Sequence, residues 1–234
     1  MNNYRKRYRR SKRIAERRRN VIIFSLCACS VLLLILAARA VWNRSGEKEE
    51  EKKDQLQEEV SWEGAPPLDV QLLTVNDYSR PAIPLEQING IAVHYTANPG
   101  ATAQQNRDYF ENLKDSQQTQ VSSHFVIGLE GEIIQCIPSS EMSYATNERN
   151  VDTLSIECCH PDETGKLKKA TYNSLVDLTA WLCSRFILST DDIIRHYDVT
   201  GKNCPKYFVE NPEKWEQFKE DVHKKMENLK EEAQ

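Results

Sequence analysis

The sequence predicts an α/β fold, in which a single domain with a central mixed β-sheet flanked by helices follows one N-terminal transmembrane helix. Three observations lead to this fold class. Short apolar runs typical of strands alternate with stretches of helical periodicity, two of the runs are joined by an acidic-Gly turn, and a long uncharged run lies near the N-terminus. A chain of 234 residues with 39% hydrophobic content and a formal charge of -4 accommodates one ordinary domain with appendages.

Charge and hydropathy divide the N-terminal part of the chain. Residues 1–20 contain ten Lys or Arg against the single acid Glu16, and the segment 21–38 that follows has no charged side chain. An apolar run of this length predicts a transmembrane helix. The basic segment should then stay in the cytoplasm, which makes the protein a single-pass cell-membrane protein with its C-terminal bulk on the extracellular, cell-wall side. The alternative is a cleaved signal peptide, because Ala38-Arg39-Ala40 has the form of a cleavage site.

A membrane span directly after the basic residues also argues against a nucleic-acid arm, so no nucleic-acid partner is expected. Residues 39–67 are dense in Glu and Lys, which predicts a charged linker that cannot fold alone. Pro66-Pro67 mark its end. The folded domain is expected at 68–222, followed by a charged tail at 223–234. This domain is large enough for a sizeable core.

The first half of the domain begins with an extended lead-in at 70–84, where prolines disfavour helix. Asn89–Tyr95 predicts the first strand, and Thr102 is a suitable N-cap for the helix that follows. Ser123–Leu129 and Glu132–Ile137 predict a β-hairpin around Glu130-Gly131.

The second half alternates strand and helix. Thr153–Cys159 predicts a strand with apolar residues on one face and Glu157 on the other. Thr171–Phe186 has the strongest helical stripe in the chain. Ile193 and Ile194 predict a short buried strand that ends at His196, and Pro212 is expected to open the last helix.

The segment from Arg195 to Pro205, predicted to be an irregular loop, concentrates chemically active residues. It contains His196 and Cys204, and a neutral imidazole and a thiolate are two of the three protein ligands that a catalytic zinc requires. The best third ligand is His94, at the end of the first predicted strand. Spacing alone leaves a second interpretation of equal weight, because a lone His or Cys is often a core residue.

Five cysteines lie in the expected domain, and two of them are adjacent, which is not typical of a disulfide framework. The odd number leaves at least one free thiol, as a metal ligand at Cys204 would require. The other four fall in predicted strands or a helix and are expected to be core residues.

Three segments resemble the zinc-dependent N-acetylmuramoyl-L-alanine amidases, the family of the phage amidase lysozymes and the peptidoglycan recognition proteins. They are His94–Gly100, Ser123–Ile127 and His196–Pro205, and the likeness spans about 68–218. The resemblance implies an α/β domain with a bound zinc ion and peptidoglycan as the substrate. The bond cut would join N-acetylmuramic acid to the first L-alanine of the stem peptide.

The resemblance also implies two catalytic residues. Glu157 is expected to be the general base, because many bacterial members of the family have a glutamate on the corresponding strand. Its alternative is a solvated strand carboxylate. Lys202 precedes Cys204 by two residues, similar to a phage-amidase lysine that donates to the developing oxyanion. Its alternative is an ordinary surface lysine.

Two further positions stay open at this level. Ser123 stands where some relatives have a tyrosine, so no tyrosine role is expected, and His124 is either a pocket residue or a hydrogen-bonded strand histidine. The polar loop 142–151 either lines the substrate groove or is an ordinary loop. The competing functions are a non-catalytic peptidoglycan-binding module and a zinc hydrolase with another amide substrate.

Overall fold

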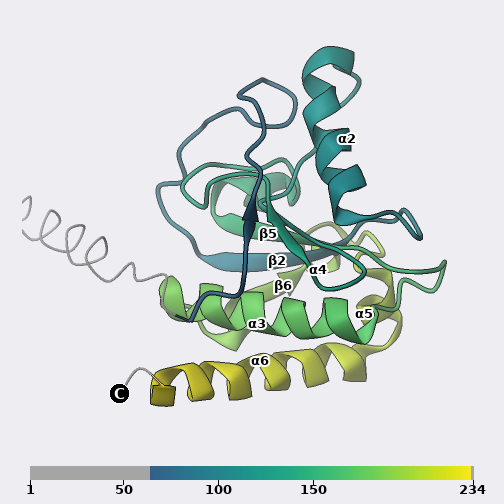
Figure 1. Cartoon of the computed structure of the whole chain (residues 1–234). Coiled ribbons are helices and arrows are strands. Elements are labelled where there is room, and N and C mark those ends of the chain that lie inside the picture. The colour runs from purple at the N-terminus through teal and green to yellow at the C-terminus, as the bar shows by residue number, and fades with distance from the viewer. Residues whose placement is uncertain (1–63, 233–234) are drawn as a thin grey trace, which may run out of the picture. The chain divides into compact units, whose positions relative to one another are not determined.

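The structure, a computed structural model, describes residues 64–232 (Figure 1). The predicted transmembrane helix at 21–38, the basic segment before it and most of the predicted linker lie outside these residues. Between residues 64 and 232, no helix combines the length and the apolar character that crossing a membrane requires.

Six strands form one mixed sheet, as predicted. The strand order is β1-β4-β3-β5-β2-β6, and every neighbouring pair is parallel except the antiparallel hairpin β3–β4. The strands are β1 (Asp69–Val70), β2 (Gly90–Tyr95), β3 (Phe125–Ile127), β4 (Ile133–Gln135), β5 (Thr153–Cys158) and β6 (Ile193–Arg195). The predicted hairpin is therefore confirmed, and the lead-in contributes one short edge strand.

Helices lie on both faces of this sheet (Figure 1). The helices α3 and α6 run side by side against one face, while α2 lies across the opposite face. The helices are α2 (Ala103–Ser116), α3 (Lys169–Arg185), α4 (His196–Thr200), α5 (Lys206–Glu210) and α6 (Pro212–Glu232), with 3-10 turns η1 (Asn147–Val151) and η2 (Thr190–Asp192).

Strand alternation gives the sheet two different faces. Leu154 and Ile156 of β5 join the larger core beneath α3 and α6, where Phe218 is fully buried. Because successive side chains of a strand point to opposite faces, Glu157 lies on the other side, as predicted. On that side a smaller apolar cluster packs beneath α2 around Phe110. Next to this cluster, the polar side chains of His94, Glu157 and His196 line one cavity.

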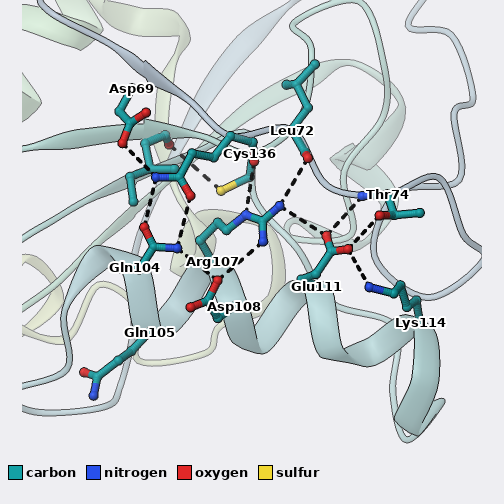
Figure 2. Close-up of polar contacts among 12 residues, drawn as sticks. Asp69, Leu72, Thr74, Gln104, Gln105, Arg107, Asp108, Glu111, Lys114 and Cys136 are labelled. Atoms are coloured by element: carbon teal, nitrogen blue, oxygen red, sulfur yellow. Dashed lines mark hydrogen bonds and ion pairs between the residues drawn. The ribbon is translucent and has the colours of Figure 1, made fainter.

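Polar contacts fasten α2 to the lead-in (Figure 2). Thr102 is the N-cap of the helix, as predicted. It also forms a capping box with Gln105. Further along the helix, Arg107 donates to the carbonyl of Gln71, and Glu111 accepts from the hydroxyl of Thr74 at 2.6 Å. The lead-in is thus part of the packed domain.

Two expectations need correction. The segment 195–205 is not a wholly irregular loop, because His196–Thr200 forms the one-turn helix α4. The side chain of Asp198 accepts the backbone N–H of Arg195 at 2.8 Å, which favours a helical start, so His196 opens a helix and does not end a strand. The tail expected from 223 continues α6 to Glu232, because its apolar stripe extends to the buried Met226.

Candidate metal centre

Sheet topology brings together three side chains with metal-binding atoms. His94 lies near the end of β2, and His196 directly follows β6, the parallel neighbour of β2. Because parallel strands end at the same edge of a sheet, the two imidazoles meet there, with ring centroids 4.7 Å apart. With Cys204 they form a buried cluster whose potential ligand atoms all lie within 4.8 Å of one another.

The helix α4 returns Cys204 to the two histidines. Gly201 ends α4 in the left-handed conformation, with φ of 74°, which a glycine adopts without strain. The backbone N–H of Tyr197 then donates to the carbonyl of Cys204 at 2.9 Å. The result places the Cys204 sulfur 3.8 Å from Nδ1 of His94. The short helix α4 and the turn after it therefore bring Cys204 back to the two histidines.

The other ring nitrogen of each histidine has a partner on the loop 142–151. Nε2 of His94 lies 3.2 Å from the hydroxyl of Thr146, and Nε2 of His196 lies 3.0 Å from Oδ1 of Asn147. Nδ1 of His196 is buried without a hydrogen-bond partner among the described residues. Together with the thiol and the second imidazole, this buried nitrogen forms a donor set suited to a metal ion.

Burial controls the protonation of these groups. It lowers the pKa of His94 to about 3, with further lowering by the charges of His196 and Lys202. It also lowers the pKa of His196, so both imidazoles are neutral and able to act as ligands at neutral pH. Burial, together with the nearby Glu157, raises the pKa of the Cys204 thiol to about 12. A cation must therefore displace the thiol proton on binding.

Glu157 and Lys202 complete the polar end of this site. Glu157 is paired with His94 across β5 and β2, and its Oε2 is buried without a partner among the described residues. Burial raises the pKa of Glu157 to about 8, while the charge of Lys202 acts in the opposite direction. The exposed Lys202 lines the same cavity. The structure thus brings together all five residues that sequence reasoning selected.

A cavity of about 450 Å³ opens beside the cluster. Its lining includes Tyr109 and Phe110 of α2 and Tyr144 of the loop 142–151. The loop 142–151 therefore lines the cavity, and its role toward a substrate stays a prediction. An elongated molecule that enters the cavity can reach Glu157, Lys202 and the His-His-Cys cluster together.

Other histidines and cysteines have structural roles. The backbone N–H of Ser155 donates to Nδ1 of His124, at 3.0 Å, and Nε2 of His124 donates to the carbonyl of Glu141, at 2.8 Å. His124 is thus the hydrogen-bonded core histidine of the two alternatives. The remaining four cysteines of residues 64–232 are buried and free, as expected for core residues.

Sequence reasoning did not identify Thr146 and Asn147 as individual residues of the site. They belong to a polar loop whose composition resembles that of any surface loop. Asn147 has a φ of 54°, a left-handed conformation that asparagine tolerates better than most residues.

Comparisons with known proteins agree with this arrangement. A family model described as N-acetylmuramoyl-L-alanine amidase matches residues 84–207, which include all five of the selected residues. The chain is 35% identical over 162 residues to the N-acetylmuramoyl-L-alanine amidase CwlL of Bacillus licheniformis, covering 63% of this chain and 44% of that protein. It is 34% identical over 175 residues to BlyA of Bacillus subtilis (strain 168), covering 66% and 46% of the two chains.

The chain therefore spans less than half the length of these two relatives. Among solved structures, the catalytic domain of XlyA superposes with a TM-score of 0.56 at 26% identity. That superposition covers 67% of this chain and 99% of the other. The fold described above is thus similar to that of a complete catalytic domain.

Proposed function

Because the chain belongs to the N-acetylmuramoyl-L-alanine amidase family, we propose that it hydrolyses the amide bond between N-acetylmuramic acid and L-alanine in peptidoglycan. We propose zinc as its metal and His94, His196 and Cys204 as the ligands. The relatives named as amidases support the reaction and the substrate.

One observation carries this proposal: a His-His-Cys donor set, a buried carboxyl and a cationic side chain meet in one open cavity. Two imidazoles and a thiolate leave the fourth position of a tetrahedral zinc ion free, as catalytic zinc sites require. The unpaired Nδ1 of His196 fits this set, because a buried nitrogen without a partner is costly unless a ligand occupies it. When bound, zinc supplies a Lewis acid that polarises a carbonyl and acidifies water.

Glu157 is proposed as the general base. Its carboxylate oxygen accepts a proton from the attacking water and then delivers it to the nitrogen of the leaving L-alanine. A carboxyl with a pKa near neutrality suits both steps, and burial raises the pKa of Glu157 to about 8 in the metal-free protein. A cation bound beside it lowers that pKa, which favours the carboxylate at neutral pH.

Lys202 is proposed to stabilise negative charge on the carbonyl oxygen. Its side chain lines the cavity with the cluster, two residues before Cys204. An ammonium group attracts an oxyanion that exists only after water attacks, so it stabilises the transition state more than the bound substrate.

The reaction is tested on purified cell wall with the full chain in detergent. The proposal predicts new amino termini on L-alanine and intact glycan strands. Wall binding without new termini would show a binding module, and cleavage confined to other amides would show a different hydrolase. Either result would overturn the proposed activity.

We further propose that residues 21–38 anchor the protein in the cell membrane with the amidase domain on the cell-wall side. Support comes from sequence alone, namely an 18-residue uncharged run after ten basic residues. Protease added to intact, wall-stripped cells should degrade the domain and leave a small membrane-bound fragment. A mature chain that begins at Val41 would establish cleavage instead.

A further inference from the structure

Two consecutive residues of the loop 142–151 each contact one histidine of the His-His-Cys cluster. The Thr146 hydroxyl meets Nε2 of His94, and the Asn147 side chain meets Nε2 of His196. In both cases the contact is made on Nε2. Nδ1 of His94 lies 3.8 Å from the Cys204 sulfur, and Nδ1 of His196 is buried without a partner among the described residues.

The chemistry of the Asn147 contact determines which nitrogen of His196 bears the proton. An amide oxygen accepts hydrogen bonds and cannot donate them. Since Oδ1 of Asn147 lies 3.0 Å from Nε2, that nitrogen must be the donor and must hold the proton of the neutral ring. Nδ1 is then left with its lone pair, as metal binding requires.

The loop is built to hold this geometry. Oδ1 of Asn150 accepts the backbone N–H groups of Ala145 and Thr146, at 3.0 and 2.6 Å. Thr146 is only 1% exposed, and Asn147 adopts a left-handed backbone with φ of 54°. A loop tied in this way keeps the Thr146 hydroxyl and the Asn147 oxygen in place before any metal arrives.

We propose that Thr146 and Asn147 are positioning residues. The Asn147 oxygen holds His196 with the proton on Nε2 and Nδ1 free for the metal, and the Thr146 hydroxyl, which can donate or accept, orients the ring of His94. This inference rests on the proposed metal site, but it concerns the geometry of the protein before metal and substrate bind. It assigns the loop a second task, since the same segment also lines the cavity.

The variants follow from the local geometry. Asn147→Gly removes the amide and keeps a residue that adopts positive φ easily, and Thr146→Val removes the hydroxyl and preserves the side-chain shape. Gln117→Gly is the matched control for the first, because Gln117 also has a φ of 54° and lies outside the cavity. Thr179→Val is the matched control for the second, because the buried Thr179 hydroxyl has no partner among the described residues.

The decisive measurement is the tautomer of the His196 ring in the metal-free full chain in detergent, from the nitrogen-15 shifts of the histidine side chains. We expect the Nε2–H form in the wild type and in both controls, and a mixture of tautomers in Asn147→Gly. An unchanged His196 tautomer in Asn147→Gly, or an Nδ1–H form in the wild type, would overturn the proposal.

Zinc affinity, measured by competition with a chelator, is the second readout. Each site variant should bind zinc roughly 10-fold to 100-fold more weakly, the usual effect of removing a partner that orients a ligand. The two controls should bind as the wild type does, and Asn147→Asp, which keeps an acceptor oxygen, should restore most of the affinity. Wild-type affinity in both site variants would contradict the inference. Because neither readout uses cell wall, an inactive enzyme would leave this test intact.

Discussion

His94 and Glu157 occupy paired positions on the neighbouring parallel strands β2 and β5, and both line the cavity beside the His-His-Cys cluster. One strand pair therefore carries both a proposed metal ligand and the proposed general base. Both side chains are placed by sheet register, which is more rigid than a loop. This pairing allows the two roles to be separated by substitution.

Glu157→Gln should leave zinc bound and lower kcat by roughly 100-fold to 10,000-fold, the usual contribution of a positioned acid or base. The amide keeps the shape of the side chain but cannot accept the water proton. Elemental analysis and wall-digestion rates check this. Near-normal turnover would reduce Glu157 to a strand carboxylate.

Cys204→Ser should lose zinc and activity together, because a serine hydroxyl is a poor zinc ligand at neutral pH. His94→Ala and His196→Ala should also bind no zinc at near-stoichiometric metal. Controls are Cys183→Ala and His223→Ala, two residues outside the cluster, which should retain one zinc per chain. Full zinc retention in a ligand variant would remove that residue from the site.

Lys202→Met should lower kcat roughly 100-fold to 1,000-fold if its ammonium stabilises the oxyanion. The pH profile gives a second test. The charge of Lys202 lowers the pKa of Glu157, so its removal raises that pKa. The carboxylate then forms only at higher pH, and the acidic limb of kcat/KM should move upward. Lys214→Met, on the exposed surface of α6, should leave both unchanged.

Glu111→Gln should destabilise the domain near neutral pH. Although burial raises the pKa of Glu111, hydrogen bonds from Lys114 and Thr74 lower it to about 2 (Figure 2). A depressed carboxyl pKa stabilises the fold above the unfolded value of 4.5, and the effect is lost as pH falls toward 2. A hydrogen bond to a charged group contributes roughly 1.5–3 kcal/mol, and solvent screening at the partly exposed Lys114 places the expected loss at or below the lower end of that range.

Chemical denaturation at several pH values tests this prediction. The difference between wild type and Glu111→Gln should be greatest above pH 4.5 and should narrow toward pH 2. Asp115→Asn is the control on the same helix, because the Asp115 side chain is 76% exposed and should contribute little. A pH-independent difference would show that the carboxylate charge is not what stabilises the contact.

Elements that depend on local patterns could be predicted from the sequence. Alternation in residues 153–158 predicted which face of β5 Glu157 occupies, and helical periodicity predicted α3. Residue types selected His94, His196 and Cys204 as candidate ligands, and the resemblance of three ordered segments to the amidase family supported this choice over a core role. These signals are readable because periodicity and motif spacing are properties of short stretches of chain.

Contacts between residues that are far apart in the sequence became visible only in the tertiary structure. His94 and Thr146 are 52 residues apart, and their contact depends on the register of β2 with β5 and on the path of the loop. The helix α4 was missed because a single turn has too few residues for a periodic signal, and it forms where Asp198 and Gly201 hold its two ends. Partners that orient a ligand carry no sequence pattern of their own, since one hydroxyl or amide at the right place is sufficient.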